Sequence, residues 1–358
     1  NGYKNKEHIH WLKKKFRLQW ILYFGLALGI VTCVFPYLAL EIFEYLVLFV
    51  IIVVYRAMKR MNTKKKLVYT ARVRRLLTTE LILTAAVFAL VCGLGGMKRI
   101  PGLCLILVSV NLFLDIVANV INHPMEAGIN QHYINDAVRK LKSVPGLTVI
   151  GVTGSYGKTS VKFYLQTLLQ EKYNVLVTPE SFNTPMGVVW TIRGSLKPTT
   201  EIFVCEMGAR HVGDIKEICD MVHPEHGVIT SIGPQHLETF FNMENIQKTK
   251  FELADALPEG GMLFLNGDND YIQQQAASPA YDQTPEKIFY YSETEGTGYC
   301  AKDVKVSQLG TEFTVVTPDG ESERFQMRLI GAHNVINVVG AIAVAHKMGM
   351  TLQELRIP

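Results

Sequence analysis

Residues 147–169 have the sequence LTVIGVTGSYGKTSVKFYLQTLL, and this stretch decides the fold of the second part of the chain. Leu147–Val152 is a short apolar run typical of a buried strand, and Val161–Leu169 has the apolar spacing of a helix. The segment between them, Gly151–Ser160, is rich in glycine. A strand, a glycine-rich loop and a helix in this order form the setting of a phosphate-binding loop. The stretch therefore predicts a nucleotide site.

The residue types in this loop fit that chemistry. Glycines let backbone N–H groups approach phosphate oxygens, the Lys158 ammonium can contact the β- and γ-phosphates, and the Thr159 hydroxyl can bind Mg²⁺. Val152 stands where the strict G-x-x-x-x-G-K-[ST] pattern has its first glycine, so the motif is a variant. A plain glycine turn is the alternative. The further loop residues predicted at the nucleotide are Gly154, Ser155, Gly157 and Ser160.

Strands and helices continue to alternate after the loop. Short apolar runs are found at 174–178, 202–205, 227–231 and 261–265. Polar residues follow several of them, among them Thr178, Glu206 and Asn266. In a parallel α/β sheet the carboxyl ends of the strands meet at one edge, where ligands bind. The sequence therefore predicts a mostly parallel sheet with helices on both faces, and polar groups beside the phosphate loop.

Five blocks of the chain, in order, resemble those of the Mur ligases, most closely the UDP-N-acetylmuramoyl-tripeptide–D-alanyl-D-alanine ligase branch. The resemblance covers about residues 146–358. The blocks are Gly151–Ser160, Ser181–Gly187 (SFNTPMG), Glu206–Ile215 (EMGARHVGDI), Ile229–Glu238 (ITSIGPQHLE) with Thr249–Glu252 (TKFE), and Gly331–Asn337 (GAHNVIN).

The resemblance implies an ATP-dependent ligase, which transfers the γ-phosphoryl group to a carboxylate so that an amine can attack the acyl phosphate. It implies catalytic roles for Lys158, His236 and Lys250, with Lys250 carbamylated. Metal ligation by two Mg²⁺ ions is expected at Thr159, Glu206, His236 and Lys250. Nucleotide contacts are expected at Asn183, His333, Asn334 and Asn337. Without the resemblance, Lys250 would be an ordinary helix-surface lysine and His236 a capping or core histidine.

The first third of the chain differs in composition. Residues 1–123 hold 17 Lys/Arg and 5 Asp/Glu, a net charge of +12, whereas residues 124–358 hold 19 and 27, a net charge of −8. Apolar stretches at about 20–37, 38–55, 76–97 and 100–121 approach the roughly 20 residues that a transmembrane helix needs. Arg56–Arg75 has nine Lys/Arg and no acid. The positive-inside rule then predicts a multi-pass protein of the cell membrane with a cytoplasmic catalytic domain.

These observations predict an α-helical four-helix transmembrane unit (1–123), a linker (124–145) and an α/β ATP-binding domain (146–358). Residues 304–330 resemble a small β-subdomain of the family. The family's third domain, which receives the amino acid, has no counterpart before Pro358 and is expected to be absent from this chain. Small residues such as Gly25 and Gly29 in the apolar part are compatible with a homo-oligomer.

The predicted function is a membrane-bound amide ligase of cell-wall or envelope polymer synthesis. Its expected partners are the lipid bilayer, a UDP-linked or lipid-linked carboxylate acceptor, and an amino acid or dipeptide, with no nucleic acid. Two alternatives stay open, a poly-γ-glutamate (capsule) synthase and a P-loop membrane ATPase or transport component. The second is disfavoured because the apolar run 202–205 is followed by Glu206 rather than Asp. The cysteines form no C-x-x-C pair, which disfavours a zinc ribbon.

Overall fold

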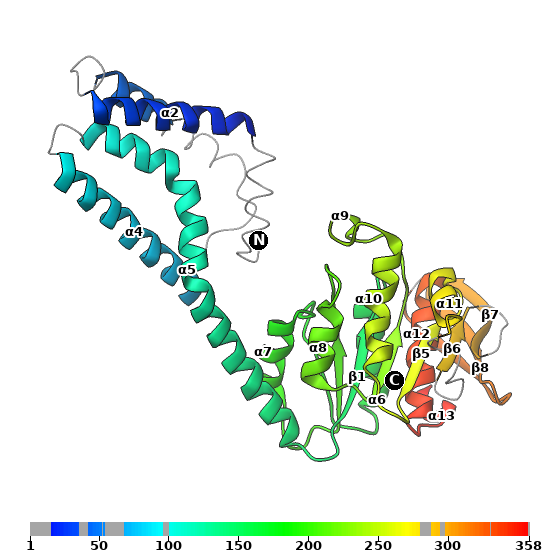
Figure 1. Ribbon diagram of the computed structural model, residues 1–358. Helices are drawn as coiled ribbons and strands as arrows, with labels where there is room; N and C mark the ends of the chain where they lie inside the picture. The colour runs from blue at the N-terminus through cyan, green and yellow to red at the C-terminus, as the bar shows by residue number, and fades with distance from the viewer. Residues whose placement is uncertain are drawn as a thin grey trace. The chain divides into compact units, whose positions relative to one another are not determined.

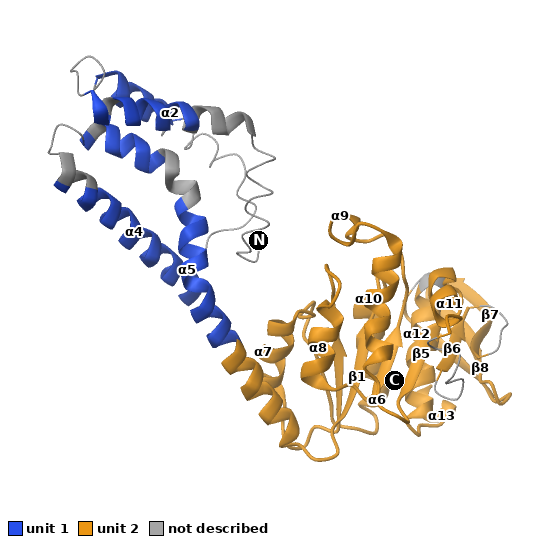
Figure 2. Cartoon of the chain, viewed as in Figure 1, with its two compact units in different colours: residues 1–130 blue, residues 131–358 orange. Residues whose placement is uncertain are grey.

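The computed structural model describes residues 16–35, 42–51, 53, 68–95, 100–279, 288–293, 298–329 and 331–356 (Figure 1). The chain divides into two compact units, residues 1–130 and 131–358, coloured separately in Figure 2. Helix α5 contributes residues to both units, because it runs without a break from Ile100 to Lys142. The segment 124–142, which the sequence suggested as a linker, is the second half of this helix.

The first unit is helical. Its named helices are α2 (Phe16–Val34), α4 (Ala71–Gly95) and the first part of α5 (Ile100–Lys142). Helix α2 passes close to α5 at Gly29, where a Cβ atom would lie 2.7 Å from the carbonyl oxygen of Gly102. Helices α4 and α5 are joined by polar contacts: Arg75 Nε donates to Glu126 Oε1 at 2.7 Å, and the Thr79 hydroxyl to Asn122 Oδ1 at 3.0 Å.

The prediction of four transmembrane helices is wrong. Among the residues that the structure describes, no helix is both long enough and apolar enough to cross a lipid bilayer. The helices extend beyond the apolar runs. The first turns of α4 contain Arg72, Arg74 and Arg75, and α5 continues far into polar sequence. Parts of the expected spans, and most of the basic Arg56–Arg75 segment, lie outside the described residues. The predicted location in the cell membrane is withdrawn with the spans.

The second unit is built on a nine-stranded sheet of order β2-β3-β1-β4-β5-β6-β7-β8-β9. The strands from β2 to β7 pair in parallel, and β8 and β9 are antiparallel additions at one edge. The strands are β1 (Thr148–Thr153), β2 (Val175–Val177), β3 (Ile202–Glu206), β4 (His226–Ile229), β5 (Met262–Asn266), β6 (Ile288–Ser292), β7 (Tyr299–Ser307), β8 (Gly310–Val316) and β9 (Ser322–Met327). The predicted parallel sheet is therefore present.

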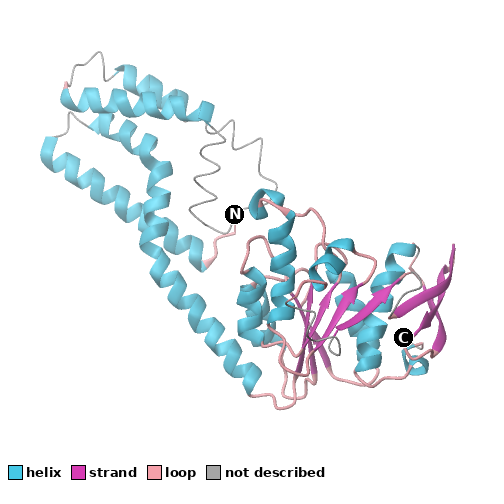
Figure 3. Cartoon of the chain, turned by 45° about the vertical axis from the view of Figure 1, so that its right-hand side comes forward, coloured by secondary structure: helices cyan, strands magenta, loops and turns pink. Residues whose placement is uncertain are grey.

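Helices cover both faces of this sheet (Figure 3). Strand residues alternate between the faces: Ile150 packs in the core cluster with α6 and α12, whereas its neighbour Val149 packs with α7 and α8. The helices of this unit are α6 (Lys158–Leu169), α7 (Pro185–Ser195), α8 (Asp214–Val222), α9 (Leu237–Phe240), α10 (Met243–Asp255), α11 (Asp270–Ala276), α12 (Ala332–Lys347) and α13 (Leu352–Leu355).

The segment that resembled a small β-subdomain extends the main sheet. Strands β8 and β9 form a hairpin, and its turn is closed by a hydrogen bond from Thr317 N to Glu321 O at 2.9 Å. Strand β7 pairs in parallel with β6 and antiparallel with β8, so it joins the hairpin to the parallel strands. The sheet is therefore continuous from β2 to β9.

The register of the central strands decides where the functional side chains meet. Val152 of β1 lies beside Glu206 of β3, and Thr153 lies beside Ile229 of β4. The carboxyl ends of β1, β3 and β4 thus lie side by side at one edge of the sheet. The glycine-rich loop follows β1 at the same edge, as expected for a ligand site in a parallel sheet.

Candidate nucleotide-binding site

The glycine-rich loop between β1 and α6 has backbone angles that favour glycine. Gly157 has φ +82°, and a Cβ atom there would lie 2.5 Å from Asn337 Oδ1. Gly154 has φ +149°, and a Cβ atom there would collide with the Thr230 hydroxyl. Any side chain at these positions would be strained and would collide with Asn337 or with the loop after β4. The two glycines therefore let the loop pack closely at the start of helix α6, whose first turn also holds the half-buried Ser160.

A second loop, which follows β4, holds the glycine-rich loop in place. The backbone N–H of Ser155 donates to Ser231 O at 2.7 Å, and that of Tyr156 donates to the Ser231 hydroxyl at 2.9 Å. The Ser155 hydroxyl donates to Gly233 O and accepts from Gly233 N, both at 3.1 Å. The Ser155 side chain therefore binds the backbone of the loop after β4. The nucleotide contact predicted for Ser155 stays a prediction.

Lys158 lies on the first turn of α6 and bends back over the loop. Its ammonium donates to Gly154 O at 2.7 Å and to Ser155 O at 3.1 Å. Burial lowers its pKa, and the nearby Glu206 carboxylate partly offsets this effect. A cation held by loop carbonyls beside helix N–H groups lies where phosphate oxygens would bind.

Glu206 is the convergence point of the site. It ends β3, its side chain is 1% exposed, and three residues, two on α6 and one in the loop after β2, donate to its carboxylate. The Thr159 hydroxyl lies 3.1 Å from both oxygens, Lys162 Nζ lies 2.9 Å from Oε2, and Asn183 Nδ2 lies 2.9 Å from Oε1. The structure therefore brings together Thr159, Asn183 and Glu206, three residues for which the sequence predicted metal or nucleotide contacts. Lys162 was not predicted.

Lys162 could have been noticed from its position on α6. Its neighbours one helical turn away, Lys158 and Leu165, and then Leu169, mark the inward face of the helix. A lysine on this face has to be paired when it is buried. The apolar spacing of Val161–Leu169 predicted a helix, and Lys162 was not singled out on it.

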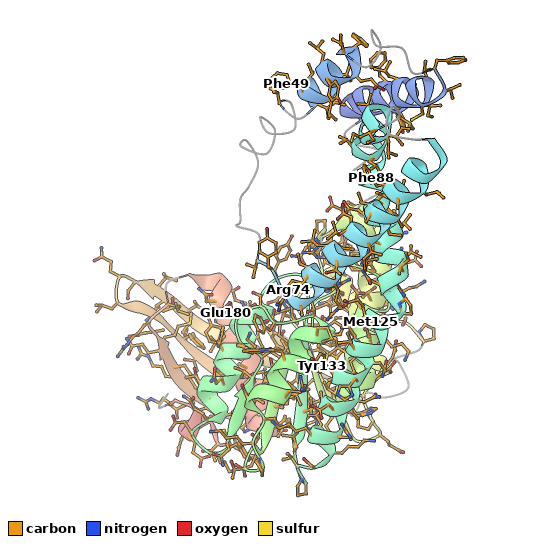
Figure 4. All side chains as sticks on the ribbon, turned by 90° about the vertical axis from the view of Figure 1, so that its left-hand side faces the viewer. Phe49, Arg74, Phe88, Met125, Tyr133 and Glu180 are labelled. Atoms are coloured by element: carbon orange, nitrogen blue, oxygen red, sulfur yellow. The ribbon has the colours of Figure 1, made fainter. Side chains whose placement is uncertain are left out.

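The loop between β2 and α7 carries Asn183 across the end of β3. Gly208 N donates to Asn183 O at 2.8 Å, and a Cβ atom on Gly208 would lie 2.7 Å from the Asn183 side chain. The loop begins at Glu180, labelled in Figure 4, which has a left-handed φ of +43°. Helix α7 then starts with Thr184 as its N-cap and Pro185 at the first position.

Lys250 lies on α10 and is 2% exposed. Burial and the charge of Lys158 lower its pKa from 10.5 to about 7. Two residues further on, Glu252 accepts from the backbone N–H groups of Gly213 and Lys216 at 2.7 and 2.9 Å, at the N-terminus of α8. This contact fixes α10 against α8 and so positions Lys250.

His236 lies at the start of α9 with a left-handed φ of +55°. Burial lowers its pKa, and the positive charges of Arg210, Lys250 and Lys158 act in the same direction. The three predicted catalytic residues, Lys158, His236 and Lys250, therefore lie in one region, to which Lys158 and Arg210 contribute positive charge. Such a region favours anionic groups.

The predicted metal ligands are only partly assembled. Thr159 and Glu206 are hydrogen-bonded to each other, whereas His236 and Lys250 lie in the cationic region. In the described part of the chain, no group of three or more His, Cys, Asp and Glu side chains is arranged to hold a metal ion. Hydroxyl and carboxylate oxygens do fit Mg²⁺, which takes few protein ligands and keeps water and phosphate oxygens.

The residues predicted on the adenine side lie at the start of α12. Asn337 borders Gly157, as noted above, and Asn334 Oδ1 accepts from the Tyr164 hydroxyl at 3.4 Å. The side chain of His333 lies outside the described residues. Asn334 and Asn337 thus lie on the α6 side of the phosphate loop, within the same unit.

The family model of the Mur ligase middle domain matches residues 152–345, more than half of the chain. The chain belongs to the Mur ligase family. The chain is 30% identical over 249 residues to a UDP-N-acetylmuramoyl-tripeptide–D-alanyl-D-alanine ligase of Escherichia coli (strain K12), covering 67% of the chain and 53% of the relative. It is 34% identical over 213 residues to the ligase of that name from Bacillus subtilis (strain 168), covering 58% and 43%.

Solved structures agree with this assignment. MurF from Acinetobacter baumannii matches with a TM-score of 0.57 and 25% identity, over 63% of this chain and 48% of that one. MurF from Thermotoga maritima in complex with ADP matches with a TM-score of 0.55 and 26% identity, over 64% and 52%. The chain therefore spans about half the length of the relatives that it matches.

Proposed function

We propose that this chain carries the ATP-binding and phosphoryl-transfer part of a ligase that joins D-alanyl-D-alanine to a UDP-N-acetylmuramoyl tripeptide in peptidoglycan synthesis. The observation that carries the proposal is the convergence of Lys158, Thr159 and Asn183 with the Glu206 carboxylate at the end of β3. The names of the curated relatives support the substrates, and the ADP complex of the Thermotoga maritima enzyme supports the nucleotide.

The residue roles follow from position and charge. The phosphate loop and Lys158 would bind the β- and γ-phosphates, and Asn334 and Asn337 would contact the adenosine, as the family resemblance implies. The Thr159 hydroxyl and the Glu206 carboxylate would hold Mg²⁺, which would neutralise phosphate charge. The positively charged region around Lys158 would accept the carboxylate of the acceptor and stabilise the charge that moves during phosphoryl transfer.

Carbamylation of Lys250 belongs to the proposal. CO₂ adds to a neutral amine, the N–C bond forms, and one proton leaves to solvent. With a pKa of about 7, Lys250 is about half neutral near pH 7, whereas an ordinary lysine is almost fully charged. The product would be a carboxylate-like group facing the cationic region. ¹³C NMR of the chain in ¹³C-bicarbonate, with Lys250→Met as control, tests this modification by the presence of a carbamate signal.

The proposed acceptor is UDP-linked. The expectation of a lipid-linked acceptor depended on the four transmembrane helices, and it loses its basis with them. The runner-up enzyme, a poly-γ-glutamate synthase, would use the same activation of a carboxylate, but the relatives named above are cell-wall ligases. Membership of the Mur ligase family also removes the grounds for a P-loop transport ATPase.

ADP release tests the proposed function. Wild-type chain would be incubated with MgATP, the UDP-linked tripeptide and D-alanyl-D-alanine, and the tripeptide and the dipeptide would be omitted in turn. We expect ADP release that needs the tripeptide, whose carboxylate is phosphorylated, and that is lost in Lys158→Ala. ADP release that is independent of the tripeptide, or equal with γ-glutamyl acceptors, would contradict the proposed substrates.

A further inference from the structure

A buried lysine lies beside the proposed metal-binding carboxylate. The Lys162 side chain is fully buried, the Glu206 side chain is 1% exposed, and Lys162 Nζ lies 2.9 Å from Glu206 Oε2. The ammonium also lies 4.6 Å from the ring centre of Phe163. A buried ion pair of this kind needs compensation on both sides, because each charge has left water. Lys162 therefore supplies the positive charge that offsets Glu206 inside the protein.

The same ammonium also holds the loop that carries Asn183. Lys162 Nζ donates to the carbonyl oxygen of Glu180, the residue with the left-handed backbone at the start of this loop. Asn183 then donates to the other oxygen of Glu206, at 2.9 Å from Oε1. One buried charge thus connects helix α6, the loop after β2 and the end of β3. The carboxylate is held from both sides.

The charge balance has a consequence for cation binding. A lone buried carboxylate attracts a free divalent cation strongly, whereas a carboxylate already paired with an ammonium has little net charge to offer. Lys158 adds further positive charge nearby, because the Glu206 carboxylate lies close enough to raise the pKa of Lys158. A divalent cation can enter such a site easily only when phosphate groups enter with it.

We propose that Lys162 is a positioning residue that acts as the internal counter-ion of Glu206, so that the site takes up its divalent cation as a nucleotide complex and not as the free ion. The proposal rests on the proposed function, in which Glu206 faces the cation of the bound nucleotide. It concerns the order of binding, and it gives Lys162 a role beyond stabilising the fold.

Mn²⁺ binding without nucleotide tests the proposal. The 358-residue chain would be titrated with Mn²⁺ alone, and the free ion measured by electron paramagnetic resonance. We expect weak binding by wild type and binding about tenfold tighter or more in Lys162→Met, because removal of one charge leaves the carboxylate uncompensated. Lys162→Arg keeps the charge and should bind as wild type does.

Two controls separate the charge effect from a folding defect. Lys216→Met removes a lysine from an exposed ion pair with Asp220, 2.7 Å from Oδ2, and should leave Mn²⁺ binding unchanged. The double variant Lys162→Met/Glu206→Gln removes both buried charges and should show no gain over wild type. A gain in the double variant would overturn the proposal, because the added binding would then not come from Glu206.

Two further results would overturn it. Tight Mn²⁺ binding by wild type in the absence of nucleotide would show that Lys162 does not neutralise the site. Unchanged binding in a folded Lys162→Met variant, verified by circular dichroism, would assign Lys162 a structural role only. Mn·ATP binding by wild type, measured in parallel, tests the proposed function separately. A chain that binds no Mn·ATP would contradict the proposed function, whereas the titration with Mn²⁺ alone tests the role of Lys162.

Discussion

Lys250→Met is expected to change how the stability of the chain depends on pH. The wild-type lysine is buried on α10, and its pKa falls from 10.5 to about 7. In the unfolded chain the pKa returns to the ordinary value, so between pH 7 and about 10.5 the unfolded state binds more protons than the folded state. The free energy of unfolding of wild type therefore rises with pH in this window. Below pH 7 Lys250 is charged in the folded state as well, so the full cost of burying a charged amine lowers the free energy of unfolding.

The size of the effect follows from the shift. Each pH unit in the middle of the window changes the free energy of unfolding by about 1.4 kcal/mol. Since the folded-state amine is about half titrated at pH 7, we expect wild type to gain about 2 kcal/mol from this group between pH 7 and pH 9. Methionine keeps the apolar stem of the side chain and cannot titrate. Lys250→Met should therefore be more stable than wild type at pH 7, and this advantage should shrink towards pH 9.

Urea unfolding followed by circular dichroism at pH 7, 8 and 9, in buffers depleted of CO₂, measures this difference. The comparison between variants removes the contribution of titrating groups that do not interact with Lys250. Lys248→Met is the matched control, because Lys248 lies on the same helix in an exposed ion pair with Glu244, at 2.8 Å. A difference between wild type and Lys250→Met that stays constant over the three pH values would refute the reasoning.

Three further substitutions give shorter tests. Gly157→Ala should abolish nucleotide binding in a fluorescence titration while the circular dichroism spectrum stays unchanged. A side chain at φ +82° is strained and collides with Asn337, so the phosphate loop has to change its shape. Gly151→Ala should lower the free energy of unfolding by about 1–3 kcal/mol in urea, because its Cβ would lie 2.6 Å from Leu253 Cδ1 in a packed core. Asn242→Ala removes the side chain that caps α10 by accepting from Asn245 N at 2.8 Å. It should cost about 1 kcal/mol in the same assay, and no loss would contradict the capping role.

The central part of the nucleotide site could be predicted from sequence because it depends on the order of strands, loops and helices along the chain. A strand, a glycine-rich loop and a helix in succession can be arranged in space in few ways. The alternation of strands and helices predicts a parallel sheet in which the carboxyl ends of the strands meet. The structure places the Thr159 hydroxyl beside Glu206 for this reason, although 47 residues separate the two in sequence. Periodicity and strand ends carry this information, so one sequence was enough.

The buried cations were harder to predict. Lys162 and Lys250 lie on helices, and a lysine on a helix is usually exposed. Their burial follows from which helix faces meet the sheet, a property that depends on the pairing of distant strands. For Lys162 the inward spacing on α6 was a usable signal. For Lys250 the family resemblance, and not the spacing, identified the residue.

The prediction for the helical unit was wrong for a different reason. A run of apolar residues does not show where a helix begins and ends, and the four transmembrane spans were predicted from such runs alone. The long helix α5 instead continues through Asn122 and Glu126, which bond to α4, and into the second unit. Composition alone did not reveal this continuity, because an apolar segment and the polar segment after it belong to one helix.

The measurement that tests the central claim most directly is binding of ADP and ATP, with Mg²⁺, to the chain by isothermal titration calorimetry, beside Lys158→Ala. We expect one nucleotide site in wild type, with binding weakened at least about tenfold in Lys158→Ala, because the ammonium at the phosphate loop is lost. A folded wild-type chain that binds neither nucleotide, or equal binding by the variant, would contradict it.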